Sequence, residues 1–336
     1  MKNYSNFTPK LLQWFDAYKR DLPWRHTKDP YAIWLSEIIL QQTRIVQGID
    51  YWHRFMQNYP TVEQLAAASE DQVLRLWQGL GYYSRARNLH FAAQQIVEMG
   101  KFPNTFKEIR TLKGVGDYTA AAIASFAFDL PQAAVDGNVY RVLSRRFGID
   151  TPIDSTQGKK EFQLLDDELL PSDRPGDYNQ AMMDFGATLC TPASPNCDAC
   201  PFIEECVAFR ENRVGELPYK AKKTKVRTRH FSYIYIMCND EIAIHQRGAG
   251  DIWQGLWEPY LVEGDELPFD KNKLHILNQN VKHVLSHQII FTDFYLYKVD
   301  EKPAEIKGYK WIKLDEFSDY AKSHLVDSNL PTLKVL

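Results

Sequence analysis

Apolar residues recur at helical spacing along nearly all of the chain up to about residue 210. Positions three and four apart lie on one face of a helix, so this repeat predicts amphipathic helices that bury an apolar stripe. Thr61 with Gln64, and Ser69 with Gln72, have the spacing of a capping box, which marks a helix start. The clearest repeats are PKLLQWFDAY at 9–18, YAIWLSEIIL at 31–40, DQVLRLWQGL at 71–80, RNLHFAAQQIVEM at 87–99 and AAAIASFAFDL at 120–130.

The pattern changes after a basic segment at 211–230. Short aromatic and β-branched runs follow, often alternating with polar residues and separated by Gly, Asp and Asn, which predicts strands and turns. They are HFSYIYIMC at 230–238, EIAIHQR at 241–247, IIFTDFYLYKV at 289–299 and GYKWIKL at 308–314. We therefore expect an all-α domain at 1–210, a basic linker at 211–230 and a smaller α+β domain at 231–336.

The composition is that of a folded protein, with 44% hydrophobic and 13% aromatic residues. The N-terminal segment has no long apolar run or small-residue cleavage site, and no segment is apolar for long enough to cross a bilayer. We expect a cytoplasmic protein without membrane association, in which disulfides are rare. The net charge of −3 does not mark a nucleic-acid binder. The run YKAKKTKVRTR at 219–229 contains no acid and suits either a solvated linker or phosphate neutralisation.

Four of the five cysteines lie within seventeen residues, with six, two and five residues between them: Cys190, Cys197, Cys200 and Cys206. Thiols this close in a reducing compartment are more often metal ligands than disulfides or core thiols. Four thiolates also suit zinc, but the usual zinc pattern has two close pairs, and only Cys197 and Cys200 form one here. We therefore favour a [4Fe–4S] cluster held by the loop at 190–206. Cys238 stands alone in an apolar strand pattern and is expected in the core.

One carboxylate, Glu37, lies in the very apolar segment WLSEIILQQT at 34–43. With Gln41, Arg44 and Gly48 it falls at i, i+4, i+7 and i+11, which by itself favours a solvated polar stripe on an amphipathic helix. A glutamate that faces a pocket is the alternative, and the rest of the chain has to decide between the two.

Two further segments combine glycines with polar residues. In LKGVGDYTAAAIASFAF at 112–128, Gly114 and Gly116 stand between two helical patterns, where glycine lets backbone N–H groups approach a phosphate. Gly-x-Gly alone is a weak signal, but VDGNVYRVLSRRFG follows at 135–148. There Asp136 opens a helix, and a plain N-cap is its simplest interpretation.

Five motifs resemble those of the helix-hairpin-helix DNA glycosylases that carry an iron–sulfur cluster, and in particular their adenine-specific branch. They are LPWR at 22–25, SEIILQQT at 36–43, GLGYYSRARNLH at 79–90, VDGNV at 135–139 and YNQAMMDFGATLC at 178–190. The cysteine spacing is also that of the family. The resemblance covers most of residues 1–210 and implies an all-α helix-hairpin-helix glycosylase domain with an iron–sulfur cluster loop.

By this resemblance, the enzyme rotates adenine out of a duplex, where it lies opposite 8-oxoguanine or guanine, and hydrolyses its N-glycosidic bond. Anionic adenine is a poor leaving group, so an acid must protonate it and a carboxylate must face the cationic sugar. Glu37 would be the acid near adenine N7, with its pKa raised by its apolar helix. Asp136 would stabilise the oxocarbenium ion, and Asn138 and Tyr118 would shape the sugar site.

Tyr118 also separates two branches of the family. Relatives that resemble endonuclease III place a lysine at this position, which attacks the sugar and cleaves the strand. Tyrosine cannot form that Schiff base, so we expect a mainly monofunctional glycosylase. The lysine is missing even if Tyr118 is only a packing residue.

Other positions follow from the same motifs. Trp24, Arg25 and Gln180 resemble an adenine pocket in which an amide pairs with the purine edge. Gln42 and Tyr82 resemble residues that enter the base stack beside the orphaned base, where aromatic stacking is worth about 1–3 kcal/mol. Core packing is the alternative for Trp24 and Tyr82. The other expected DNA or lesion contacts are Gln41, Thr43, Leu80, Gly114, Gly116, Leu285, Ser286 and His287.

Residues 231–336 resemble the family's C-terminal domain, a Nudix-like α+β domain in which QGLWEPY at 254–260 is similar to the segment GLWEFP. The hydrolase box REUxEExGU, whose glutamates hold magnesium, does not occur in this region. We expect a lesion-recognition domain without hydrolase chemistry. The family reads oxidised guanine with Phe-Ser-His, and here the loop is Leu285-Ser286-His287, which weakens the wedge contact but not the polar contacts.

Three functions are compatible with parts of this pattern. The first is excision of adenine opposite 8-oxoguanine or guanine by a monomer that binds duplex DNA in association with the nucleoid. The second is an endonuclease III-like pyrimidine lyase, which Tyr118 and the additional domain oppose. The third is a DNA-binding iron–sulfur redox sensor, which the pair Glu37 and Asp136 opposes.

Overall fold

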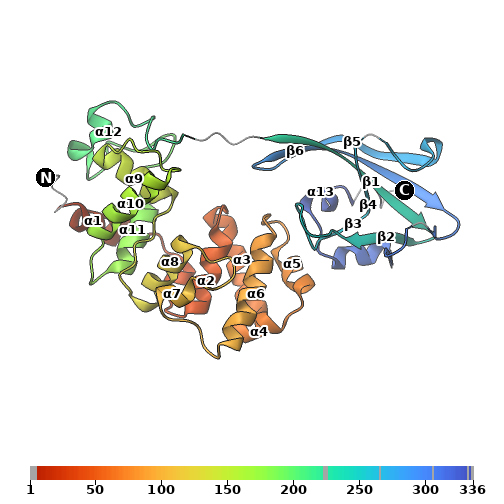
Figure 1. The fold of residues 1–336 in the computed structure, drawn as a ribbon, viewed down its shortest axis with the longest axis horizontal. Coiled ribbons are helices and arrows are strands. Elements are labelled where there is room, and N and C mark those ends of the chain that lie inside the picture. The colour runs from red at the N-terminus through yellow and green to blue at the C-terminus, as the bar shows by residue number, and fades with distance from the viewer. Residues whose placement is uncertain (1–5, 222–225, 265, 305, 331–332, 334–336) are drawn as a thin grey trace. The chain divides into compact units, whose positions relative to one another are not determined.

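The computed structural model describes residues 6–221, 226–264, 266–304, 306–330 and 333. By their contacts, these residues form two compact units (Figure 1). The first unit consists of residues up to 66 together with 91–223, and the second of 67–90 together with 224–336. The predicted functional division into 1–210, 211–230 and 231–336 stays a prediction.

The first unit is helical, as the apolar repeat predicts. Its elements are α1 Phe7–Tyr18, η1 Pro23–Arg25, α2 Pro30–Leu40, α3 Ile45–Asn58, α7 Phe106–Ile109, α8 Asp117–Phe128, α9 Gly137–Phe147, α10 Thr156–Leu169, α11 Pro175–Thr188, η2 Ile203–Glu205 and α12 Val207–Arg210. Two helices, α4 Val62–Ala67 and α6 Ser84–Glu98, contribute residues to both units, and α5 Glu70–Trp77 belongs to the second.

Local signals explain where several helices begin. Asp29 accepts a hydrogen bond from the N–H of Tyr31 at 3.0 Å, and Pro30 is the first residue of α2, where a missing N–H does no harm. At α5 the predicted capping box is complete, with Ser69 and Gln72 exchanging bonds of 2.9 and 3.2 Å. The sequence therefore determines these ends locally, before any tertiary contact.

Packing then brings six helices together. α11 packs against α1, α8 and α9, while α2 packs against α3 and α8. Aromatic side chains such as Phe7, Phe162 and Phe185 fill the core beneath α9 and α11. Because α2 is buried from Tyr31 to Ile39, any polar group on it is taken out of water.

The described residues of the second unit form a seven-stranded mixed sheet in the order β3-β2-β1-β6-β5, with β4 paired to β1 and β7 to β2. Its strands are β1 Arg227–Cys238, β2 Glu241–Gln246, β3 Trp257–Glu258, β4 Tyr260–Glu263, β5 Leu274–Val284, β6 Gln288–Val299 and β7 Lys310–Lys313. β1 and β6 run parallel, and the other pairs are antiparallel. The expected α+β class is confirmed.

Alternation along β1 explains how the sheet is covered on both faces. Phe231, Tyr233 and Tyr235 point into one apolar core, and Ile234 and Ile236 into another. Cys238, predicted to be a core residue, is buried at the end of the strand. A strand buried on both faces reads as a continuous apolar run, which is the pattern of HFSYIYIMC.

Two features of the second unit bear on function. In the described part of the connection between β4 and β5, the regular element is the short η3 Lys271–Lys273, and no α-helix is present. Two further short elements, η4 Leu314–Asp319 and α13 His324–Asp327, follow β7.

Residues 67–90 are hydrogen-bonded to the rest of the second unit at two points. The Nε1 of Trp257 donates to Asp71 at 2.8 Å, and the hydroxyl of Tyr83 donates to the Lys322 carbonyl at 3.2 Å.

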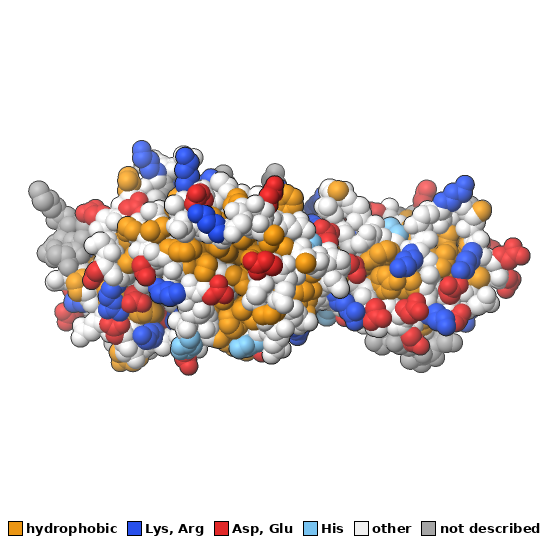
Figure 2. Space-filling model, turned by 90° about the horizontal axis from the view of Figure 1, so that it is seen from below, with side chains coloured by type: hydrophobic (Ala, Val, Ile, Leu, Met, Phe, Trp, Pro, Cys, Tyr) orange, Lys and Arg blue, Asp and Glu red, His pale blue; other side chains and the backbone are white. Residues whose placement is uncertain are grey.

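The face shown in Figure 2 carries no simple sign of a ligand. On the face in Figure 2, acidic and basic side chains are interspersed with apolar ones rather than gathered by sign. Among the described helices, none is both long and apolar enough to span a membrane. The cavities and the buried polar groups are therefore the features that indicate function.

Candidate active site

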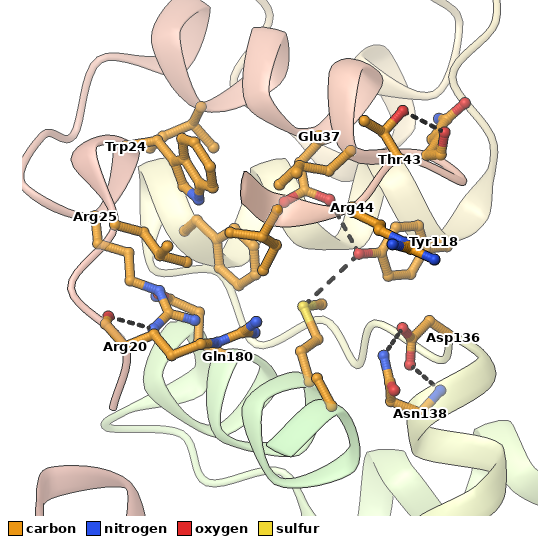
Figure 3. Close-up of a pocket in the computed structure, with 18 of the residues that line it drawn as sticks. Arg20, Trp24, Arg25, Glu37, Thr43, Arg44, Tyr118, Asp136, Asn138 and Gln180 are labelled. Carbon is orange, nitrogen blue, oxygen red and sulfur yellow. Dashed lines mark hydrogen bonds between the residues drawn. The ribbon is translucent and has the colours of Figure 1, made fainter. Parts of the chain in front are cut away.

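A cavity of about 610 Å³ opens in the first unit between η1, α2, α8, α9 and α11 (Figure 3). Ten of the predicted site residues line it: Trp24, Arg25, Glu37, Gln41, Gln42, Thr43, Tyr118, Asp136, Asn138 and Gln180. They come from segments more than 150 residues apart, so the fold gathers them and not the local sequence. Trp24 and Arg25 lie on one side of Glu37, and Asp136 and Asn138 on the other.

Glu37 does not belong to a solvated stripe. Its side chain faces the cavity from the middle of α2 and is only 7% exposed. Burial raises the pKa of Glu37 to about 7, the hydrogen bond from Tyr118 lowers it, and the nearby Asp136 raises it again. A carboxyl with a pKa near neutrality can hold a proton at physiological pH and deliver it, which is what a general acid requires.

Tyr118 is the second residue of α8, directly after the glycine hairpin. Its hydroxyl donates to Glu37 Oε2 at 3.0 Å and lies 3.7 Å from the sulfur of Met183. Burial raises the pKa of Tyr118 well above its usual range, so the hydroxyl stays protonated and remains a donor. Tyr118 therefore orients the carboxyl of Glu37 as well as lining the cavity.

Asp136 is the N-cap of α9, and it also faces the cavity. Its Oδ1 accepts the backbone N–H groups of Asn138 and Val139 at 2.8 and 2.9 Å, and its Oδ2 accepts the Asn138 side chain at 2.7 Å. Burial raises the pKa of Asp136, whereas these three bonds and Arg141 lower it. The plain-cap interpretation is correct but incomplete, because the capped carboxylate lies beside a cavity.

A network that the sequence did not reveal fixes Arg25. The guanidinium of Arg25 donates to both oxygens of Asp184, at 2.8 and 2.9 Å, and to the carbonyl of Arg20. Asp184 is fully buried, and Arg20 pairs with it as well. Burial raises the pKa of Asp184, but Arg25 and Arg20 lower it further, so the group stays ionised. The sequence offered one signal for Asp184, its spacing. It follows Gln180 by four residues on α11, so the two side chains lie on the same face of the helix.

The other pocket residues have mixed roles. Trp24 is buried and makes an edge contact with Trp52 at 6.0 Å, so it is both a core residue and a cavity wall. Gln41 donates to Thr119 Oγ1 at 3.3 Å. Gln42, in the turn after α2, has a left-handed φ of 55°, which is uncommon for a residue with a side chain and often marks a functional turn.

The glycine hairpin lies outside this cavity, between α7 and α8. Gly114 has a φ of 79°, which a residue with a Cβ adopts only with strain. Gly116 caps α8 with an ordinary φ, and a Cβ there would meet nothing within 4 Å, so its surroundings are open. The hairpin thus presents bare backbone at a helix N-terminus, the arrangement expected of a phosphate contact.

A second cavity, of about 460 Å³, lies wholly in the second unit and contains the predicted lesion loop. Leu80, Tyr82, Leu285, Ser286 and His287 line it. Tyr82 is 43% exposed, has a φ of 47° and donates its hydroxyl to Ser286 Oγ at 3.1 Å. Core packing therefore does not account for Tyr82, while Leu285 packs against the apolar core of the sheet.

The four clustered cysteines line one small cavity together with apolar side chains such as Leu189, Ile203 and Phe209. Among the described residues, no three His, Cys, Asp or Glu side chains are arranged to hold a single metal ion. Arg141 links this region to the first cavity, because it donates to the carbonyl of Cys190 at 2.8 Å and to Asn138 Oδ1 at 2.7 Å.

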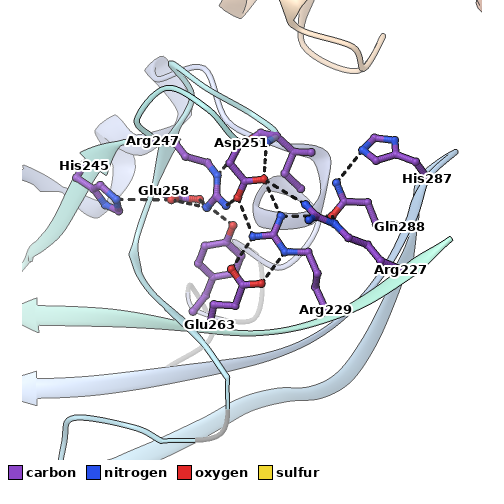
Figure 4. A network of polar contacts seen from close by, with 11 residues as sticks. Arg227, Arg229, His245, Arg247, Asp251, Glu258, Glu263, His287 and Gln288 are labelled. Carbon is purple, nitrogen blue, oxygen red and sulfur yellow. Dashed lines mark hydrogen bonds and ion pairs between the residues drawn. The ribbon is translucent and has the colours of Figure 1, made fainter. Parts of the chain in front are cut away.

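The basic run is only partly available to a phosphate. Residues 222–225 of this run lie outside the described residues. Arg229 is 8% exposed and makes paired contacts of 2.6–2.7 Å with Asp251 and Glu263 (Figure 4). A role for Arg229 in phosphate neutralisation is therefore wrong, because its charge is already compensated by two carboxylates.

Comparisons with known proteins match two domain families along the chain. A profile described as HhH-GPD superfamily base excision DNA repair protein matches residues 35–166, and a NUDIX domain profile matches residues 232–330. The solved structure of a thermostable thymine-DNA glycosylase is 30% identical, with a TM-score of 0.58 over 62% of this chain and 97% of that chain. A trapped endonuclease III–DNA covalent intermediate, 22% identical, shares the fold with a TM-score of 0.55 over 63% of this chain and 99% of that chain.

Several proteins with similar sequences are named adenine DNA glycosylase. The adenine DNA glycosylase of Mus musculus is 45% identical over 222 residues, which are 63% of this chain but 43% of the mouse protein, so the match spans less than half of that relative. The adenine DNA glycosylase of Buchnera aphidicola subsp. Baizongia pistaciae is 33% identical over 298 residues, which are 85% of this chain and 84% of that protein. With this identity over most of both sequences, the chain belongs to the adenine DNA glycosylase family.

Proposed function

We propose that this protein is a monofunctional DNA glycosylase that removes adenine opposite 8-oxoguanine or guanine from duplex DNA. One observation carries the proposal: an acid whose pKa is near 7, Glu37, shares a cavity with the helix-capped carboxylate Asp136. Cleavage of an N-glycosidic bond by this route needs a proton donor for the base and a negative charge for the sugar.

Glu37 would protonate the purine. The buried helix α2 disfavours the carboxylate, so the group holds its proton until adenine enters, and Tyr118 keeps the carboxyl oriented. Protonation turns adenine from an anionic into a neutral leaving group. General acid catalysis of this kind contributes about 10²–10⁴-fold to a rate.

Asp136 would stabilise the oxocarbenium ion that forms as the base leaves. Its oxygens are held by the first N–H groups of α9 and by Asn138, so the charge is positioned before the substrate arrives. Fixed donors and charges of this type need no reorganisation during the reaction. Water then adds to the sugar and leaves an abasic site.

The wall formed by Trp24, Arg25 and Gln180 would hold the extrahelical adenine. The amide of Gln180 can pair with the purine edge, and the anchored guanidinium of Arg25 cannot swing away because Asp184 holds it. Since Tyr118 occupies the position where a lyase needs an amine, no Schiff base with the sugar can form there. This supports base removal without strand cleavage and opposes the pyrimidine-lyase alternative.

The second unit would read the base left behind. The loop Leu285–His287 and Tyr82 share one cavity, and the missing Nudix box and the paired state of Glu258 oppose magnesium-dependent hydrolysis. The partner would be duplex DNA containing an A:8-oxoguanine or A:G mispair, bound by a monomer through the hairpin at Gly114 and Gly116. We accordingly assign the glycosylase role to 1–210, the linker to 211–230 and lesion recognition to 231–336.

A [4Fe–4S] cluster would be held by Cys190, Cys197, Cys200 and Cys206. The donor set fits, because four thiols share a cavity with apolar walls, and each thiolate of such a cluster binds its own iron rather than one common ion. When bound, the cluster would tie the loop at 190–206 into one piece and provide a one-electron redox centre. Zinc is the alternative, but its usual pattern has two close cysteine pairs, and only Cys197 and Cys200 form one here.

Single-turnover assays on duplexes with adenine opposite 8-oxoguanine, guanine or thymine test this function. We expect adenine release from the first two duplexes and strand breaks only after alkali treatment. Strand cleavage without alkali, or release of pyrimidines, would favour the lyase. Tight DNA binding without release of any base would favour the redox-sensor alternative.

A further inference from the structure

One buried cation, Arg145, lies beside the cysteine cavity without an acidic partner. It belongs to the third turn of α9 and is 3% exposed. Its guanidinium donates to the carbonyls of Thr191, Pro192 and Leu217 at 2.7, 2.9 and 3.1 Å. Among the described residues, no carboxylate forms an ion pair with it.

The remaining contact of this guanidinium is with sulfur. Nη1 of Arg145 lies 3.5 Å from the Sγ of Cys190, within hydrogen-bonding range of a thiolate. Arginine does not lose its proton in proteins, and a buried charge without a counter-charge is strongly destabilising. Carbonyl dipoles supply part of the compensation. The negative charge that is still missing is the one that ligand thiolates would bring.

The geometry points to Arg145 as the residue that sets the reduction potential of the cluster, an inference that rests on the cluster proposed above. An N–H···S bond and a fixed positive charge both stabilise the state that carries one more electron. Arg145 would therefore raise the potential. It would act through the Cys190 thiolate, and three carbonyl contacts hold it in place, so its charge cannot move away when the cluster changes oxidation state.

The neighbouring Arg146 provides a matched control. It too lies beside the loop, but it donates to the side chain and the carbonyl of Glu205, both at 2.5 Å. Its charge is thus already neutralised by a carboxylate. Replacing Arg146 also removes a positive charge near the loop, one that acts on Cys206, but among the described residues it breaks no N–H···S bond.

The test compares Arg145→Lys and Arg145→Gln with Arg146→Gln and the unaltered protein, each loaded with iron as judged by iron content and visible absorbance. Redox titration of the cluster is the readout. For Arg145→Gln we expect a shift of the oxidised-to-reduced ratio by about tenfold toward the oxidised form, which is about 59 mV for one electron. Arg145→Lys should give a smaller shift, and Arg146→Gln, which keeps the N–H···S bond of Arg145, should also shift the potential less than Arg145→Gln.

Equal reduction potentials in all four iron-loaded proteins would overturn the inference. Arg145 would then only hold the loop in place. If the Arg145 variants lose iron, the unaltered protein decides through pulsed paramagnetic resonance with ¹⁵N-labelled guanidinium groups. Arg146→Gln should retain the nitrogen coupling to the cluster, and its absence would also contradict the inference. Protein that holds zinc instead of iron would refute the cluster itself, whatever the result of the glycosylase assay.

Discussion

Glu37 and Glu258 are two buried glutamates with one feature in common and one difference. Each accepts a hydrogen bond from a tyrosine, Tyr118 at 3.0 Å and Tyr233 at 2.8 Å. Glu258 also receives Nη1 of Arg247 on both oxygens, at 2.9 and 3.1 Å (Figure 4). Glu37 has no ion pair among the described residues, and it faces a cavity. Compensation by Arg247 makes Glu258 structural, whereas Glu37, which has no ion pair among the described residues, is free to react.

A third buried acid, Asp166 on α10, shows that a raised pKa alone does not make a site. Burial raises the pKa of Asp166 to about 7, as for Glu37, and the hydroxyl of Tyr178 donates to it at 2.7 Å. Asp166 is fully enclosed in the core and lines none of the described cavities. Access to a substrate-sized space therefore separates Glu37 from Asp166, while charge compensation separates it from Glu258.

Glu37→Gln should have the largest effect on the reaction. The amide cannot donate the proton, so we expect single-turnover adenine release to fall by about 10²–10⁴-fold while DNA binding stays nearly intact. Release kinetics and a gel-shift titration measure the two properties separately. Glu258→Gln is the matched control and should leave the excision rate unchanged. Near-normal adenine release by Glu37→Gln would show that Glu37 is not the general acid.

Glu258→Gln should instead reduce stability. Removing one member of a buried ion pair leaves the charge of Arg247 incompletely compensated. The free energy of unfolding should fall by about 3–5 kcal/mol. Urea unfolding measures this loss. Glu263→Gln is the control, because its carboxylate is half exposed, and such pairs contribute about 0–1 kcal/mol. Equal midpoints for the two variants would contradict the structural role of Glu258.

Asp166 should make stability depend on pH. Its folded pKa of about 7 lies above the ordinary value of 3.8, so the folded state binds more protons between these values. This contribution to stability is therefore complete below about pH 4, declines as pH rises to about 7 and is then flat. Asp166→Asn should remove its share of the slope in unfolding curves measured between pH 4 and 8 and leave the share of Glu37, without changing the excision rate. An unchanged slope would assign the pH dependence to other groups.

The excision rate itself should fall at high pH. Once the pH exceeds the pKa of Glu37, about 7, each further pH unit lowers the protonated fraction of Glu37 about tenfold. Tyr118→Phe deletes the hydrogen bond that lowers this pKa, so its rate should begin to fall at a higher pH. Single-turnover rates from pH 6 to 9 test both expectations. A rate that is flat to pH 9 in the unaltered protein would mean that Glu37 does not donate the proton.

The smallest effect is expected in the lesion loop, away from the three acids. Ser286→Ala combined with His287→Ala removes polar contacts worth about 0.5–1.5 kcal/mol each. The preference for A:8-oxoguanine over A:G should decrease, while excision from A:G changes little. Excision rates on the two duplexes give the comparison. Equal losses on both would show that the loop supports folding or general DNA binding.

Much of this architecture follows from local sequence signals. The helical period, the capping box at Ser69 and the alternation in β1 are properties of neighbouring residues, so the sequence reveals them directly. The environment of Glu37 could not be predicted locally, because Tyr118 on α8, which contacts its carboxyl, lies 81 residues away in the chain. Asp184 and Arg145 were missed for the same reason: each acts through partners more than 40 residues away. Arg229 looked like part of a solvated run until the fold brought Asp251 and Glu263 to it.

The most direct test of the central claim changes the substrate rather than the protein. If Glu37 delivers its proton to N7 of adenine, a duplex with 7-deazaadenine opposite 8-oxoguanine has nothing there to protonate. The unaltered protein should bind this duplex as tightly as the adenine duplex and release no base in a single-turnover assay. Release of 7-deazaadenine at a rate close to that of adenine would contradict the account, because the bond would then break without the proton that Glu37 is placed to give.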